Sequence, residues 1–133
     1  MDRVLVDSGF LVAYGKKQDS SAYRFLAEYR GALFTVSAVI VETCFFLDAG
    51  AKRELLGWIG EGSLSVVEVP VAAYPELSAM IGKYADRKVD FADAALVWLA
   101  EQSGIRRILT TDRRDFHTFR LRSGKHFEPL AWF

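Results

Sequence analysis

The fold of this chain is decided by residues 3–9, which read Arg3-Val4-Leu5-Val6-Asp7-Ser8-Gly9. The short, β-branched apolar run predicts a buried strand, and Ser8-Gly9 lets the chain turn directly into a helix. A carboxylate at the tip of a buried strand is costly to desolvate unless a cation or hydrogen-bond donors compensate it. Asp7 is therefore either a helix cap or a metal ligand, and its apolar setting favours the ligand.

Working outward, similar signals predict alternating helices and strands. Further strands are expected at residues 33–36, 64–69, 107–111 and near 127–130, and helices at residues 10–14, 20–30, 37–48, 52–61, 75–84 and 90–101. Asp19 or Ser20, and Ser37, are expected as helix caps, whereas Gly50 and Gly104 are expected to stop helices. The rest of the C-terminal segment is expected as polar loop. Strands separated by helices imply right-handed crossovers, so we predict an α/β fold with a mostly parallel central sheet of four to five strands and helices on both faces.

Further acids stand beside these elements. Glu42 lies in an apolar helical segment, where a lone charge needs a partner such as a metal ion, an arginine or a helix N-terminus. Asp90 and Asp93 are three residues apart and share one side of a first helical turn, with Asp90 as cap or outer ligand and Asp93 projecting inward. Asp112 follows its strand as Asp7 follows the first one.

These acids are expected to meet, because parallel strands of an open α/β fold place their ligands at one edge of the sheet. Crowded carboxylates repel each other and raise their own pKa values, so such a cluster indicates a counter-ion. Oxygen ligands alone favour Mg²⁺ or Mn²⁺ over zinc, and neither histidine has a spacing that resembles a zinc motif. We therefore predict that Asp7, Glu42, Asp93 and Asp112 bind metal.

Length and composition are those expected of one cytoplasmic domain, residues 1–133. Cys44 is the only cysteine, so no intrachain disulfide can form. No apolar stretch approaches the roughly 18 residues that a membrane span needs. The hydrophobic fraction of 51% is high for a domain of this size, which leads us to expect a homodimer or a bound partner, although a well-filled core would also account for it.

The distribution of charge says more than its sum. Seventeen basic and seventeen acidic residues cancel, so the net charge does not indicate nucleic-acid binding. Between Arg106 and Lys125, however, seven basic residues stand against two acids. This excess is either a margin that guides a polyanion to the acidic site or a solvated surface that balances acids elsewhere.

Four sequence marks occur in order along the chain. They are Val4-Leu5-Val6-Asp7-Ser8, Ser37-Ala38-Val39-Ile40-Val41-Glu42, Asp90-Phe91-Ala92-Asp93-Ala94 and Thr110-Thr111-Asp112-Arg113-Arg114-Asp115-Phe116. Together they resemble the PIN-domain proteins, and more closely the VapC-type toxins of toxin–antitoxin pairs. The resemblance implies a three-layer α/β/α fold and a metal-dependent endoribonuclease, in which the four acids hold one or two Mg²⁺ or Mn²⁺ ions. Hydrolysis of this kind needs no histidine base and leaves a 5′-phosphate and a 3′-hydroxyl.

The resemblance also assigns roles around the acids. Ser8 and Thr111 match small hydroxyl positions beside the pocket, and Asp115 is expected to act as a cap or an outer acid. Gly9 departs from the Ser or Asn often found there, which puts one pocket hydrogen bond in doubt. An antitoxin partner is implied. The basic residues that flank the pocket in sequence are candidate contacts to RNA phosphates or solvated surface charges: Lys16, Lys17, Arg113 and Arg114.

Other classes of protein fit less well. A haloacid-dehalogenase-type phosphatase needs a second acid two residues after the strand-end Asp, where this chain has Gly9. A receiver-like signalling module needs a neighbouring pair of acids after the first strand and a lysine after a late strand, and neither is found. A non-catalytic PIN fold that acts as an interaction or scaffold protein remains the alternative.

Overall fold

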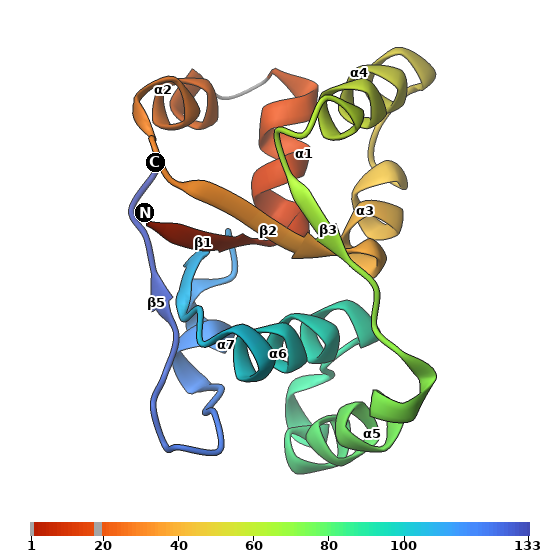
Figure 1. Ribbon diagram of the computed structural model, residues 1–133, viewed down its shortest axis with the longest axis vertical. Helices are drawn as coiled ribbons and strands as arrows, with labels where there is room; N and C mark the ends of the chain where they lie inside the picture. Colours follow the sequence, from red (N-terminus) through yellow and green to blue (C-terminus); the bar gives the residue numbers. More distant parts are fainter. Residues whose placement is uncertain (1, 18–19) are drawn as a thin grey trace.

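A parallel sheet forms the centre of the protein (Figure 1). The computed structural model describes residues 2–17 and 20–133, and in them the sheet has five strands in the order β3-β2-β1-β4-β5. The strands are β1 Arg3–Val6, β2 Ala32–Val36, β3 Ser65–Val67, β4 Arg107–Leu109 and β5 Glu128–Pro129. All four strand pairs are parallel, which confirms the predicted sheet. Because β1 lies between β2 and β4, the strand order reverses at β1, and this is where such folds bind ligands.

Helices cover both faces of the sheet. Figure 1 shows α1 to α4 on one side of the sheet and α5 to α7 on the other, so the three-layer α/β/α arrangement is confirmed. The described helices are α1 Ser8–Lys16, α2 Ser20–Glu28, α3 Ser37–Cys44, α4 Ala49–Gly60, α5 Tyr74–Lys83, α6 Phe91–Ser103 and α7 Arg113–Thr118, with 3-10 turns η1 Val71–Ala73 and η2 Ala85–Arg87. None of the helices in the described residues is both long and apolar enough to cross a membrane.

The central strand is buried on both faces. Val4, Leu5 and Val6 have no exposed surface, because α1 and α6 pack over the sheet from opposite sides. This burial explains why the strand is a continuous apolar run rather than an alternating one. α6 is buried nearly all round, and Asp90 and Gly104 cap its two ends as predicted. The residues at the end of β1 and at the start of α6 are therefore held by well-packed elements.

One predicted helix, residues 37–48, is wrong in its extent. α3 ends at Cys44, and Asp48 instead begins α4, because its carboxylate accepts a 2.8 Å hydrogen bond from the backbone N–H of Ala51. Gly50 consequently lies in the first turn of α4 and does not stop a helix. The aspartate cap sets the boundary, since it satisfies a backbone donor that the glycine cannot.

Other predicted boundaries also need correction. Ser37 does not cap α3, because Val36 holds that position and the Ser37 hydroxyl donates to Glu68 at 2.9 Å. The C-terminal segment contains α7 where polar loop was predicted, since the side chain of Asp112 caps a short helix. Asp19, an expected cap, lies outside the described residues. The remaining helix and strand ends agree with the predictions within three residues.

A candidate carboxylate site at the edge of the sheet

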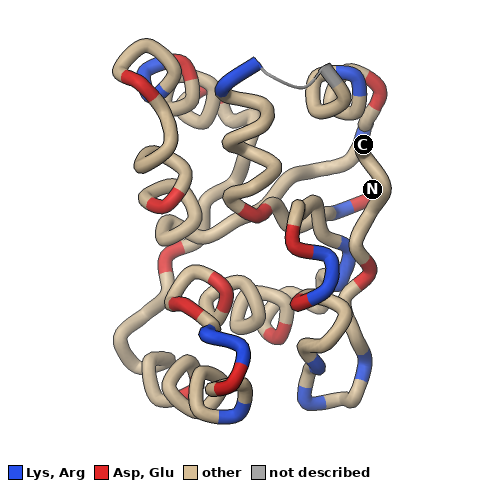
Figure 2. The backbone as a smooth tube through the Cα atoms, turned by 180° about the vertical axis from the view of Figure 1, so that it is seen from behind, with Lys and Arg blue, Asp and Glu red and all other residues tan. Residues whose placement is uncertain are grey.

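A cleft of about 440 Å³ opens where β1 and β4 end. Its walls come from four separate parts of the chain, which meet because the strands are parallel. Figure 2 shows acidic positions from these separate segments gathered around the middle of the molecule. The residues that line the cleft are Asp7, Ser8, Gly9, Val12, Glu42, Phe46, Asp90, Asp93, Thr111 and Asp112. The cleft thus brings together all four predicted ligands and Asp90, and we call it the acid cleft.

Asp7 is the most deeply buried of these acids, with 6% of its surface exposed. One carboxylate oxygen accepts from the Ser8 backbone N–H at 2.8 Å and so caps α1, while the other accepts from the Thr110 hydroxyl at 2.8 Å. Burial raises the pKa of Asp7 above its ordinary value, and these two hydrogen bonds offset part of that rise. Asp7 is therefore both a cap and a carboxylate facing the cleft.

Glu42 is held by the serine that follows Asp7. The Ser8 hydroxyl donates to Oε1 of Glu42, and so α1 and α3 are joined at the cleft. Burial raises the pKa of Glu42, the Ser8 hydrogen bond lowers it and Asp90 raises it further. The sequence suggested an apolar environment all round Glu42, but two of its apolar neighbours do not enter the core. Val41 is 62% exposed and Phe45 is 82% exposed. Glu42 itself is half-buried.

Asp90 and Asp93 form a reciprocal cap at the start of α6. The Asp93 backbone N–H donates to Oδ1 of Asp90 at 2.8 Å, and the Asp90 N–H donates to Oδ2 of Asp93 at 3.4 Å. Burial raises the pKa of Asp93 to about 8, with added repulsion from Asp90 and Asp7. Without a cation, Asp93 is consequently largely protonated at neutral pH.

Thr110 links the first and the last acid, and sequence reasoning missed it. Its hydroxyl donates to Asp7 and accepts from the backbone N–H of Asp112 at 2.9 Å. The sheet register explains this, because Val6 pairs with Leu109 at the ends of the two strands, and Asp7 and Thr110 are the residues that follow. The sequence does show that Asp7 and Asp112 each follow an apolar run. Only the strand register, however, determines that the Thr110 hydroxyl lies next to Asp7.

Asp112 caps α7, accepting from the Asp115 backbone N–H at 3.3 Å. Burial raises the pKa of Asp112, and the neighbouring Asp115 carboxyl adds to the rise. Asp115 does not line the acid cleft, and its carboxylate forms an ion pair with Arg87 at 3.0 Å. The role of Asp115 as an outer acid therefore stays a prediction.

Gly9 is required by close packing at the cleft. A Cβ at this position would stand 2.0 Å from Oγ1 of Thr111, so any larger residue would displace the threonine. Thr111 lines the cleft and is exposed there. The departure from Ser or Asn is therefore explained by the contact between α1 and the segment after β4.

The candidate phosphate contacts differ in how freely they can reach a ligand. Lys17 pairs with Glu54 at 3.3 Å, and Arg113 donates to a backbone carbonyl near the C-terminus and lies over the Phe133 ring. Lys16 and Arg114 are exposed, and neither forms an ion pair among the described residues.

The acid cleft has the donors that a hard divalent cation prefers. Its carboxylates supply oxygen alone, and burial and mutual repulsion raise their pKa values, which a bound cation would reverse. Within the described residues, no group of three or more His, Cys, Asp or Glu side chains is already arranged to hold an ion. Ligation would therefore require the side chains to turn toward a common point from their present hydrogen bonds.

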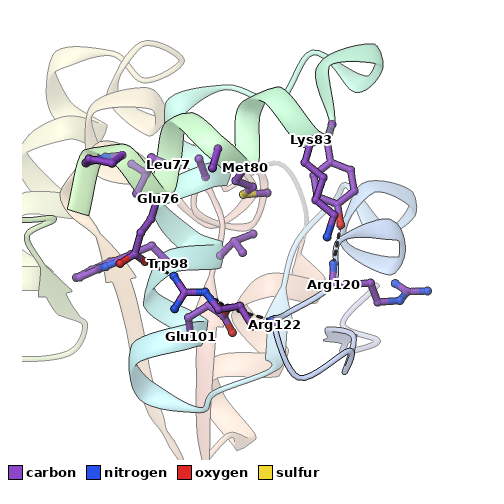
Figure 3. A pocket seen from close by; sticks show the side chains of 13 residues that line it. Glu76, Leu77, Met80, Lys83, Trp98, Glu101, Arg120 and Arg122 are labelled. Carbon is purple, nitrogen blue, oxygen red and sulfur yellow. Dashed lines mark hydrogen bonds and ion pairs between the residues drawn. The ribbon is translucent and has the colours of Figure 1, made fainter. Parts of the chain in front are cut away.

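A second cavity, of about 450 Å³, lies between α5 and α6 (Figure 3). Its floor is apolar, with Leu77 and Met80 from α5. At one end Arg122 pairs with Glu76 at 2.8 Å and with Glu101 at 3.4 Å, and the close-up shows these three side chains pointing toward one another. The acids of this cavity, which we call the Arg122 cavity, are neutralised within the chain, so it does not suit a cation.

Comparisons with known proteins show the family to which the chain belongs. The PIN domain family model matches residues 4–120. The chain belongs to the PIN domain family. Among curated proteins, Ribonuclease VapC26 of Mycobacterium tuberculosis (strain ATCC 25618 / H37Rv) is 29% identical over 134 residues, covering 96% of this chain and 99% of that protein.

Two solved structures share the fold. Mycobacterium tuberculosis VapC20, described as a toxin that cleaves the sarcin–ricin loop, aligns with a TM-score of 0.74 at 20% identity, over 84% of this chain and 93% of that one. A toxin–antitoxin complex from Klebsiella pneumoniae contains a chain that aligns with a TM-score of 0.61 at 13% identity, over 98% of both chains. At these identities the likeness concerns the fold alone.

Proposed function

We propose that this PIN-domain chain is an endoribonuclease of the VapC toxin type that depends on Mg²⁺ or Mn²⁺. The observation that carries the proposal is the set of carboxylates that share the acid cleft, where burial and mutual repulsion raise their pKa values. Such a site is stable only if protons or a cation neutralise it. The relative VapC26 is a ribonuclease, which supports RNA as the substrate. Membership of the PIN domain family favours a nuclease over a phosphatase.

The residues of the cleft have distinct tasks in this proposal. The bound cation would act as a Lewis acid, making water a better nucleophile and offsetting charge at the scissile phosphate. Asp7, fixed by two hydrogen bonds, anchors the ligand set, and Ser8 orients Glu42. Asp93 must lose its proton to become a ligand, because its pKa is about 8. Asp112, positioned by Thr110, completes the set.

The test is cleavage of a structured RNA by the purified protein in Mn²⁺, with EDTA and Asp7→Asn as controls. Cleavage that both controls abolish supports the nuclease. Asn can keep the acceptor for the Ser8 N–H, so a fold that melts normally would tie any loss of activity to the missing charge. Intact RNA together with tight binding of a partner protein would instead support the non-catalytic scaffold.

The exposed apolar side chains around α3 support self-association. Val41, Phe45 and Phe91 line one open surface, and the Tyr74 ring packs edge-on against Phe91 beside it. We infer that this α3 patch is buried in a homodimer, because contiguous exposed apolar surface marks interaction sites. Sedimentation at micromolar concentration should show a dimer, and Phe45→Ser should shift it toward monomer. A wild-type monomer under these conditions would rule the dimer out.

An antitoxin partner and a cytoplasmic location complete the proposal. The shared fold with a chain of the Klebsiella toxin–antitoxin complex supports the partner. A substrate of RNA and a single cysteine suit a reducing, RNA-containing compartment. Expression of the chain alone should then slow growth, and Asp93→Asn should relieve the effect. Toxicity that persists in Asp93→Asn would argue against poisoning through the nuclease site.

A further inference from the structure

The acid cleft continues along α1 beyond the carboxylates. α1 contributes Ser8, Gly9 and Val12 to the acid cleft and Gly15 and Lys16 to a neighbouring cavity of about 510 Å³. Ser8, Val12 and Lys16 follow one another at four positions, and Gly15 stands three positions after Val12, and such spacings place residues on one face of a helix. One continuous helical face therefore runs under both cavities.

An aromatic ring forms the opposite wall of both cavities. Phe46 lines the acid cleft and the neighbouring cavity, and 58% of its surface is exposed. It lies in the turn between α3 and α4, which the hydrogen bond from its N–H to the Thr43 carbonyl helps to fix at 3.0 Å. α1 lies close to this turn, because a Cβ at Gly15 would be 3.1 Å from Cδ2 of Leu47. We call this surface, lined by Val12, Gly15, Lys16 and Phe46, the α1 groove.

One cation in the α1 groove forms no ion pair among the described residues. Lys17 pairs with Glu54, whereas Asp48 caps α4 through a hydrogen bond and keeps its negative charge in the same cavity. Lys16 has no ion pair in the part of the chain that the structure describes. An exposed ring beside a free cation is the combination that binds single-stranded nucleic acid, because any base can stack on the ring while a phosphate meets the cation.

We propose that the α1 groove holds single-stranded RNA next to the scissile phosphate, with a base stacked on Phe46 and a phosphate paired with Lys16. The inference rests on the proposed nuclease function, since the groove opens into the acid cleft and a strand that leaves the cleft along α1 must cross the ring. From Ser8 to Lys16 the helix rises about 12 Å, enough for a strand a few nucleotides long. Phe46 and Lys16 are then substrate-binding residues and not metal ligands.

The experiment measures binding rather than cleavage. A fluorescein-labelled 12-nucleotide oligouridylate is titrated in Mg²⁺ with protein in the Asp7→Asn background, which removes one repelling carboxylate and prevents hydrolysis. Adding Phe46→Ala should weaken binding about 5- to 100-fold, whereas Phe46→Trp should preserve it. Adding Lys16→Ala should weaken binding and reduce the slope of log K against log salt by about 0.7. Phe133→Ala and Lys83→Ala are the matched controls, because Phe133 is 64% exposed and neither residue lines the groove or the α3 patch.

The outcomes separate this inference from the nuclease proposal. Affinity unchanged in Phe46→Ala and Lys16→Ala, or no binding of the oligonucleotide at all, would overturn the RNA groove, while Mn²⁺-dependent cleavage by the wild-type chain would still stand. Binding that depends on Phe46 and Lys16 without any cleavage would keep the groove and reject the nuclease. Equal losses in Phe46→Ala and Phe133→Ala would count against stacking at the groove, since the effect would not be local. All variants should melt within a few degrees of their parent, because both rings are largely exposed.

Discussion

The acid cleft and the Arg122 cavity have similar volumes and opposite electrostatics. In the Arg122 cavity, Glu76 and Glu101 share one guanidinium, so the chain neutralises its own acids. In the acid cleft, the bonds to Asp7 and Glu42 come from hydroxyl and backbone groups rather than from a cation. Hydrogen bonds orient a carboxylate without cancelling its charge. A cluster of acids therefore indicates an external cation only where the chain supplies no counter-charge of its own.

The largest difference between the acid cleft and the Arg122 cavity is expected when one glutamate of each is changed to glutamine. Glu42→Gln should lower RNA cleavage at least about 100-fold, because it removes a charged ligand while keeping the acceptor for Ser8. Glu76→Gln should leave cleavage within about twofold, since Glu76 pairs only with Arg122 among the described residues. Initial rates at saturating Mn²⁺ measure both. Equal losses would show that the two sites do not differ in function.

Thr110→Val tests the hydroxyl that positions two acids. Asp7 would lose a donor that lowers its pKa, and the Asp112 N–H would lose its acceptor. We expect cation affinity to fall about 10- to 100-fold and the free energy of unfolding to fall by about 1–3 kcal/mol. Calorimetric titration with Mn²⁺ and urea unfolding give the two values. Thr118→Val, at the end of α7, is the control because its hydroxyl donates to the Arg114 carbonyl and to no acid, and an equal loss of affinity there would contradict the positioning role.

The stability of the metal-free protein should fall as pH rises. Asp93 has a pKa of about 8 in the folded chain against 3.8 as the reference value, so between these limits the folded state binds more protons than the unfolded state. Stability therefore decreases with rising pH across that window and levels off above pH 8. Asp93→Asn should raise the Tm at pH 9 by a few degrees, about 4 °C for each kcal/mol regained.

A melting series in EDTA from pH 6 to pH 9 measures this effect. Asp93→Asn should flatten the dependence in part, because the pKa values of Asp7, Glu42 and Asp112 are raised too. Adding Mn²⁺ should raise the Tm of the wild-type protein more at pH 8 than at pH 6, since cation and proton compete for the same oxygens. A Tm that rises with pH in EDTA would contradict the raised pKa of Asp93.

The smallest effect is expected in the Arg122 cavity. Arg122→Ala leaves the partly exposed carboxylates of Glu76 and Glu101 without their cation. It also removes the ion pairs that join the C-terminal segment to α5 and α6. Because Arg122 is itself exposed, we expect a loss of about 1 kcal/mol or less in the free energy of unfolding and no change in cleavage. Urea unfolding with an unchanged m-value would show it. A loss of activity would connect this cavity to the acid cleft.

Much of the fold was predictable because its signals are local. The run before Asp7 is apolar at every position, so it had to be a strand buried on both faces. Asp90 and Gly104 bracket a helix rich in alanine and leucine, and these caps act within a few residues of themselves. The division between α3 and α4 was harder, because Asp48 and Gly50 both carry boundary signals and the aspartate prevailed.

The sequence by itself determined which carboxylates could meet, since strand ends and helix starts are written in local composition. Tertiary structure alone decided what surrounds them. The β1–β4 register places Thr110 rather than Thr111 against Asp7, and the packing of α1 on the α3–α4 turn brings Phe46 beside Lys16. The physical reason is that hydrogen bonds and ring contacts act over a few ångströms, between residues whose distance along the chain says nothing about their distance in space.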